Sequence, residues 1–132
     1  DTTTTESYTR SLHDALPIFD RAVALSRVNG NLELLKRFIR LFVERNADTL
    51  AELARLVAAG DLEGARRTAH TLKGSAGTVG LVGVQDVAAR LEGLLQQQLA
   101  APRDTFPEHY RLLADELAGA WQRGLAAITD IS

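Results

Sequence analysis

The segment AHTLKGSAGTVGL, residues 69–81, holds the side chains of this chain that are best suited to chemistry. Lys73 follows His70 by three residues, and Gly74 comes directly after the lysine. A neutral imidazole is a good nucleophile near pH 7, because the ordinary histidine pKa is about 6.5. A neighbouring ammonium can neutralise an anion attached to that ring. These residue types therefore indicate phosphoryl transfer through histidine, which depends mainly on positioning and charge neutralisation.

The glycines of this segment need an explanation, because glycine inside a helix costs roughly 1 kcal/mol relative to alanine. Gly74 and Gly77 lie one and two turns beyond His70 on the same helical face. We interpret these bare positions as a cleared approach for a partner protein. The arginine pair one turn before the histidine adds positive potential. The predicted docking residues are therefore Arg66, Arg67, Gly74, Gly77 and Gly80.

The element that must carry this site is predicted to be a helix over residues 62–79. Apolar residues recur there at three- and four-residue spacing, and most of them are small, which favours close packing on neighbouring helices. His70 does not belong to that apolar face. We therefore expect its imidazole to point toward solvent.

Similar spacing predicts the other elements of the chain. A short helix fits residues 19–28, and a turn follows at residues 29–31. A long helix follows up to Gly60, which suits the position just after a helix end, and Asp61 suits the N-cap of the next helix. Within this long helix Asn46 interrupts the apolar stripe, either as a kink or as a polar residue beside the seam. A fourth helix contains the apolar residues Val84, Val87, Leu91, Leu94 and Leu95. A loop is predicted over residues 101–109, with Pro107 as a possible first residue of the last helix. That helix buries Tyr110, Leu113, Leu117, Trp121 and Ile128.

No segment alternates with period two over a useful length, so we expect no sheet. The predicted fold class is all-α, an antiparallel four-helix bundle with a short additional N-terminal helix. Residues 17–132 are expected to form this one domain. Residues 1–16 contain a threonine run without helical or strand periodicity, and we interpret them as a disordered tail, a linker or an artificial remnant.

Composition excludes several classes of function. The 132 residues carry a net charge of −2 and no cysteine, which argues against a strongly basic nucleic-acid surface and excludes disulfides and thiolate metal sites. No apolar run approaches the roughly 20 residues that cross a bilayer. We expect a monomer without direct membrane contact. We also expect a cytoplasmic location, which holds for this segment even if the parent protein is anchored in a membrane. A metal site is not expected either, because His13 and His109 have no clustered partners.

The motif resembles the signature of histidine-containing phosphotransfer (HPt) domains, which is His-x-x-Lys-Gly with a further glycine six residues on. In this chain those positions are His70, Lys73, Gly74 and Gly80. The preceding residues, FDRAVALSRVNGNLELLKRFIRLFVERNADTLAELARLVAAGDLEGARRTAH, are similar to the lead-in of HPt modules at the C-terminus of hybrid sensor histidine kinases. The resemblance covers about residues 17–98 well and the last helix only in general character.

This resemblance implies a phosphoryl carrier without kinase activity of its own, as part of a larger hybrid histidine kinase. His70 accepts the phosphoryl group from an aspartate of a receiver domain and passes it to another receiver, while Lys73 steadies the phosphate. In several family members a Gln or Glu twenty-two residues after the histidine orients the ring, and that position here is Glu92. The chain is expected to have no cofactor of its own, with Mg²⁺ supplied by the partner receiver.

Other functions are weighed against this one. A chemotaxis-kinase-type module has a similar motif, but its histidine is phosphorylated by a kinase domain of the same protein. A degenerate bundle that only binds receivers would not take up phosphate. Nucleotide binding is disfavoured, because GSAGTVG lacks both a preceding strand and the Gly-Lys-Ser/Thr ending of a P-loop.

Overall fold

The computed structural model describes residues 17–129 and residue 131. Its helices are α2 (Arg21–Ser26), α3 (Leu32–Arg45), α4 (Thr49–Ala58), α5 (Leu62–Thr78), α6 (Val82–Ala100) and α7 (Phe106–Thr129). The tail, linker or remnant expected at residues 1–16 lies outside the described residues, and so does His13. Within the described part every regular element is a helix.

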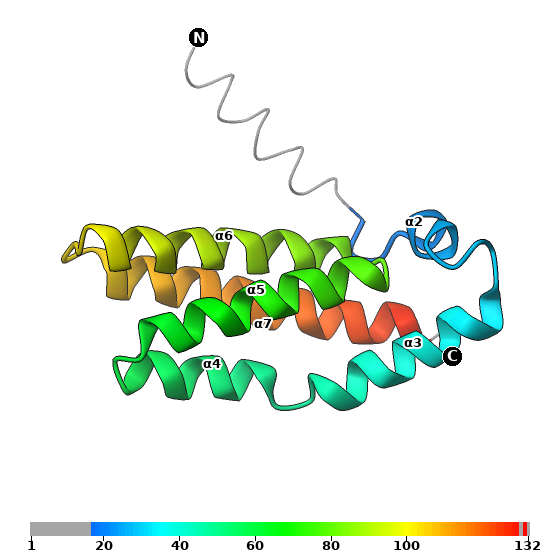
Figure 1. Ribbon diagram of the computed structural model, residues 1–132, viewed down its shortest axis with the longest axis horizontal. Helices are drawn as coiled ribbons and strands as arrows, with labels where there is room; N and C mark the ends of the chain where they lie inside the picture. The colour runs from blue at the N-terminus through cyan, green and yellow to red at the C-terminus, as the bar shows by residue number, and fades with distance from the viewer. Residues whose placement is uncertain (1–16, 130, 132) are drawn as a thin grey trace, which may run out of the picture.

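The helices form an elongated bundle in which the chain reverses direction at each end (Figure 1). α3 and α4 together make one long side, α5 runs back along them, and α6 and α7 complete the bundle. The short α2 lies beside the turn between α5 and α6. The predicted all-α bundle of four long helical segments with a short N-terminal helix is confirmed.

Helix ends follow the capping residues that the sequence contains. Asp20, Asn31 and Asp61 are N-caps, and the side-chain oxygen of each accepts a backbone N–H three residues ahead, at 2.9 to 3.1 Å. The preceding glycines, Gly30 and Gly60, have φ of +77° and +80°, a region that side chains disfavour. The turn predicted at residues 29–31 and the helix end predicted at Gly60 are therefore confirmed.

The long second helix is broken at Asn46. The chain makes a turn at residues 46–48 between α3 and α4. Asn46 is buried, its amide Nδ2 donates to the carbonyl of Phe42 at 2.9 Å, and its Oδ1 accepts from the Thr49 hydroxyl at 3.0 Å. Because a buried amide must find such partners, the side chain holds the break in place. Of the two alternatives for Asn46, the kink is therefore the one observed.

The core lies between α5 and the helices around it. α5 contributes Leu72 together with three alanines, Ala65, Ala69 and Ala76, all with no exposed surface. Such small residues let neighbouring helices approach closely, and α5 is in contact with both α4 and α6. Across the bundle the rings of Phe42 and Trp121 lie 5.5 Å apart, which joins α3 to α7.

Two boundaries differ from the prediction. α7 begins at Phe106, so the loop expected over residues 101–109 is shorter. The reason is that Phe106 is buried and stacks on Tyr110 one turn later, with ring centroids 5.9 Å apart. α6 begins at Val82, so Gly83 lies in its first turn and not in the break that the glycines of residues 80–83 predict between the third and fourth helices.

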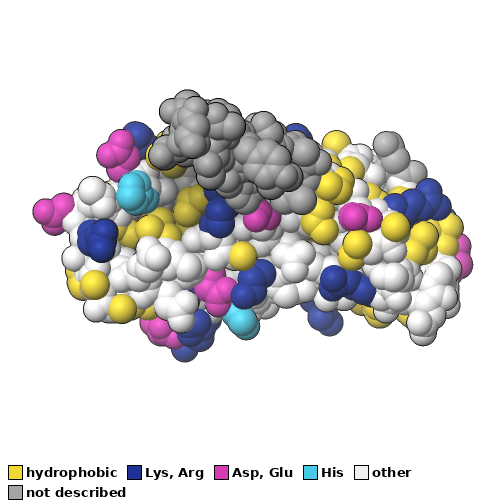
Figure 2. Space-filling model, turned by 90° about the horizontal axis from the view of Figure 1, so that it is seen from above, with side chains coloured by type: hydrophobic (Ala, Val, Ile, Leu, Met, Phe, Trp, Pro, Cys, Tyr) yellow, Lys and Arg dark blue, Asp and Glu magenta, His cyan; other side chains and the backbone are white. Residues whose placement is uncertain are grey.

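The surface carries charges of both signs. On the face shown in Figure 2, basic and acidic side chains are interspersed with hydrophobic ones along the length of the molecule. Across residues 17–129, no helix combines the length and apolar character needed to cross a bilayer. The mixture of basic and acidic side chains on this face agrees with the low net charge of −2.

Candidate functional site

His70 stands in the middle of α5 on the side that faces away from the core. Its side chain is 61% exposed, whereas Ala69 and Leu72 on the same helix are fully buried. The apolar face of α5 packs inward and so turns His70 outward. The imidazole is therefore accessible to a partner molecule, as the periodicity predicts.

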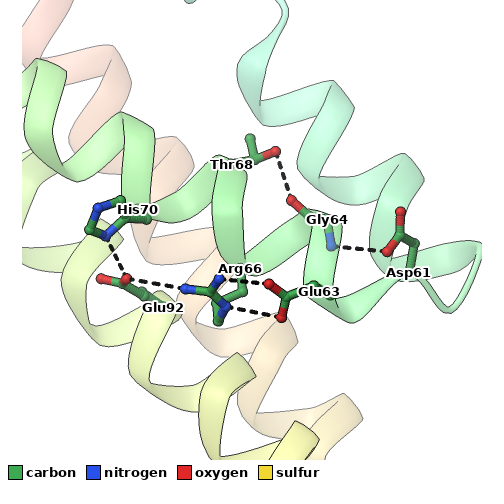
Figure 3. Close-up of polar contacts among 7 residues, drawn as sticks. All are labelled: Asp61, Glu63, Gly64, Arg66, Thr68, His70 and Glu92. Carbon is green, nitrogen blue, oxygen red and sulfur yellow. Dashed lines mark hydrogen bonds and ion pairs between the residues drawn. The ribbon is translucent and has the colours of Figure 1, made fainter.

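Glu92 on α6 contacts one nitrogen of this ring. Its Oε2 lies 2.7 Å from His70 Nδ1, and the Glu92 side chain is 13% exposed. An ionised carboxylate only accepts hydrogen bonds, so Nδ1 carries the hydrogen, and in the neutral imidazole Nε2 then keeps its lone pair. Figure 3 shows Nε2 on the side of the ring turned away from Glu92. The site thus presents a nucleophilic nitrogen to solvent.

Lys73 contacts the second oxygen of the same carboxylate. Its ammonium donates to Glu92 Oε1 at 2.7 Å. The hydrogen bond from Lys73 holds the pKa of the Glu92 carboxyl below its ordinary value; burial opposes this effect, and the bond to His70 adds to it. Glu92 is therefore ionised at neutral pH, as the assigned tautomer of His70 requires.

Arg66 approaches Glu92 from one turn earlier on α5. Its Nε and Nη2 donate to the carboxylate of Glu63 at 3.1 and 2.6 Å, and its Nη1 lies 3.9 Å from Glu92 Oε2. The predicted docking arginine is thus held between two carboxylates (Figure 3). This leaves only 25% of its side chain exposed.

Arg67 points to a different side of α5. It is exposed and lines a polar groove of about 520 Å³ between α4 and α5, together with Arg45, Thr71 and Ser75 among others. No ion pair to Arg67 occurs among residues 17–129. The two predicted arginines therefore have different surroundings, although they are adjacent in sequence.

Gly74 is open to solvent. A Cβ atom added there would meet no atom within 4 Å, and the backbone φ is not in the left-handed region. No local structural constraint thus requires glycine at this position. Next to an exposed His70, the bare backbone offers a flat approach to the ring.

Gly77 and Gly80 were predicted to belong to the docking surface, but both are buried. A Cβ on Gly77 would lie 2.6 Å from the Gln85 side chain on α6, and one on Gly80 would lie 2.7 Å from the Cβ of Ala24. Near the end of α5 its face is covered by the first turn of α6 and by α2. These glycines permit close helix packing rather than partner access.

Two side-chain contacts in this region are not predicted from the sequence. The Glu63–Arg66 pair has the three-residue spacing of helix ion pairs, which could have identified it. The bond between Lys73 and Glu92 joins two helices and has no local sequence signal. Within the described ranges, no group of three or more acidic or histidine side chains could hold a metal ion.

Comparison with known proteins gives one family match. The family model described as "Hpt domain" matches residues 37–123, which is more than half of the chain and includes His70, Lys73 and Glu92. Comparisons with curated proteins and with solved structures gave no significant match. The helical bundle, the exposed histidine and the family match agree with one another. The chain therefore belongs to the Hpt domain family, whose members carry phosphoryl groups on histidine in phosphorelays and are not kinases.

Proposed function

We propose that His70 is the phosphoryl-accepting residue, which takes the group from a receiver-domain aspartate and passes it to a second receiver. The observation that carries this proposal is the geometry of the ring. Its Nδ1 is bound to Glu92 at 2.7 Å, its Nε2 lies on the side of the exposed ring turned away from Glu92 (Figure 3), and the bare backbone of Gly74 follows one turn later on α5.

The transfer step has a simple balance. The lone pair of Nε2 attacks the phosphorus of an aspartyl phosphate, and the electrons of the breaking P–O bond return to the aspartate carboxylate. Because Nδ1 keeps its hydrogen, the phosphorylated ring becomes cationic. The Glu92 carboxylate stabilises that charge, and in the reverse direction the ring leaves phosphorus as neutral imidazole. Both directions of a relay can therefore use the same contact.

Lys73 is proposed to steady the phosphoryl group. In the structure its ammonium is bound to Glu92 rather than free, but an ammonium has three donors and a flexible stem. It lies one turn from His70 on the same helical face, so it can turn toward an anion on the ring.

The partner is proposed to dock over Gly74, with Arg67 at the edge of the contact. Mg²⁺ and its acidic ligands are proposed to come from the receiver domain. The resemblance of the lead-in sequence further suggests that the module belongs to a hybrid sensor kinase.

The experiment is phosphotransfer from a phosphorylated receiver domain in the presence of Mg²⁺. His70→Gln is compared with His109→Gln, which removes another exposed histidine at the start of α7. We expect base-stable, acid-labile label on wild type and on His109→Gln, and none on His70→Gln. Since His70 is exposed, its substitution should change the free energy of unfolding by no more than about 0.5 kcal/mol.

Two results would contradict the proposal. Label that persists on His70→Gln would place the acceptor elsewhere. With several active receivers tested, absence of label on wild type would leave a bundle that binds receivers without carrying phosphate.

A further inference from the structure

We infer that Arg66 is a positioning residue, which keeps the Glu92 carboxylate aimed at His70 during transfer. This inference rests on the proposed function of His70. It assigns Arg66 a role within the site, in place of contact with a partner.

The guanidinium of Arg66 is fixed from its far side. Glu63 binds its Nε and Nη2 at 3.1 and 2.6 Å, which is the bidentate geometry that best defines the plane of an arginine. Only Nη1 then faces α6. It lies 3.9 Å from Glu92 Oε2, the oxygen that also contacts His70 Nδ1 (Figure 3).

A second pair in the same protein shows that this arrangement is specific to the site. Arg55 binds Glu52 at the same three-residue spacing, with distances of 3.0 and 2.6 Å. Its side chain is 65% exposed, however, and it makes no second ion pair within the described part of the chain. Arg66 thus forms the same kind of ion pair within one helix as Arg55 does, and it has a second carboxylate, that of Glu92, beside it.

The need for Arg66 follows from the two tasks of Lys73. Lys73 binds Glu92 Oε1 in the structure, and in the proposed reaction it also steadies the phosphoryl group. When the ammonium turns to the phosphate, Glu92 loses its closest cation. Arg66 remains beside Oε2, and its ion pair can shorten to a hydrogen bond. The carboxylate then keeps its position and its hydrogen bond to Nδ1–H.

The test compares Arg66→Gln with Arg55→Gln, the matched pair outside the site. The first measurement is the ¹⁵N spectrum of the His70 imidazole at neutral pH, which reports the fraction of the Nδ1–H tautomer. The second is the rate of phosphorylation by phosphoramidate, a small donor that needs no docking surface. In that reaction the Nε2–P bond forms, and ammonia leaves with the electrons of the P–N bond.

We expect Arg66→Gln to lower both the Nδ1–H fraction and the phosphoramidate rate. The rate should fall roughly two- to five-fold, as for the loss of one partly exposed ion pair. Arg55→Gln should change neither quantity. Glu63→Gln removes the carboxylate on the far side of Arg66 but retains the guanidinium, so it should give a smaller change in the same direction. This variant replaces Arg66→Gln in the test if Arg66→Gln folds poorly.

The other outcomes separate this inference from the proposed function. Suppose that wild type is labelled and that Arg66→Gln leaves the Nδ1–H fraction of His70 and the phosphoramidate rate unchanged. The positioning role of Arg66 is then wrong, while the proposed role of His70 is unaffected. If Arg66→Gln slows transfer from receivers alone, Arg66 is a docking residue and the inference is again wrong. If wild type takes no label from any donor, the proposed function fails, and the inference fails with it.

Discussion

At the scale of single residues, the site is organised around one carboxylate rather than around the histidine itself. Glu92 receives His70 on one oxygen and Lys73 on the other, with Arg66 nearby. Three positively charged or hydrogen-donating groups thus share one acceptor. That arrangement fixes the tautomer of the ring and also makes the site sensitive to acid.

The contribution of Glu92 to stability is therefore expected to depend on pH. Its pKa in the folded protein is lowered from 4.5, chiefly by the hydrogen bond from Lys73. A lowered carboxyl pKa stabilises the fold above the unfolded-state value, and this stabilisation is lost as the pH falls through the folded-state value. Glu92→Gln should thus cost on the order of 1 kcal/mol near pH 7. Once the pH has fallen below the folded-state pKa of Glu92, where wild type has lost the same contribution, it should cost little.

Urea unfolding of wild type and Glu92→Gln between pH 3 and 7 measures this difference. Glu33→Gln is a suitable control, because Glu33 is 86% exposed and its nearest cation, Lys36, lies 3.8 Å away. A gap between wild type and Glu92→Gln that stays constant over the whole range would show that Glu92 does not act through its charge.

At the scale of elements, α5 combines two uses of glycine along one helix. Gly74 is open on the solvent side beside His70. Gly80, directly after the helix, has φ of +78° and lies against Ala24 and the carbonyl of Asp20. The first position bears on access to the ring, and the second on how tightly α2 packs at the α5–α6 turn.

Alanine substitutions should separate these uses. Gly74→Ala is expected to raise the free energy of unfolding by up to about 1 kcal/mol, because a helical glycine gains from a methyl group when nothing obstructs it. Gly80→Ala is expected to lower it by about 2 kcal/mol or more, from left-handed backbone strain and from a contact at 2.7 Å. Urea denaturation measures both. Equal effects of the two substitutions would mean that the packing at Gly80 is not a constraint.

At the scale of the whole molecule, α5 is the helix on which the other parts of the bundle depend. It contacts α4 on one side and α6 on the other, while Phe42 and Trp121 join α3 to α7. Since the core is continuous across these helices, the bundle should unfold as one unit.

A central core substitution should therefore destabilise the entire bundle. Leu72→Ala, at a side chain with no exposed surface, is expected to cost about 2–5 kcal/mol. Leu112→Ala, at a position 57% exposed, should change stability by no more than about 0.5 kcal/mol. Trp121 fluorescence and far-UV circular dichroism should give coincident urea transitions in both variants. Separate transitions would show that α3 and α7 unfold independently of α5.

The helix faces and helix ends could be predicted wherever they depend on residues that are close together in the sequence. Apolar spacing within α5 placed Ala69 and Leu72 inside and His70 outside, because a helix has one fixed period. Asp61 and Gly60 marked a helix boundary for the same kind of reason, since capping involves only neighbouring residues. The break at Asn46 could be suspected but not decided, because the apolar stripe continues on both sides of it.

The amino-acid sequence by itself determined the helices, the outward direction of His70 and, through the motif with Lys73 and Gly74, the family. Only the tertiary structure decided which glycines are accessible, since Gly74 and Gly77 share one face of an isolated helix and differ only because α6 covers the second. It also decided that Lys73 and Arg66 both approach Glu92. Such contacts join side chains of different helices, so their geometry depends on how α5 and α6 pack and has no signal in the spacing of either helix.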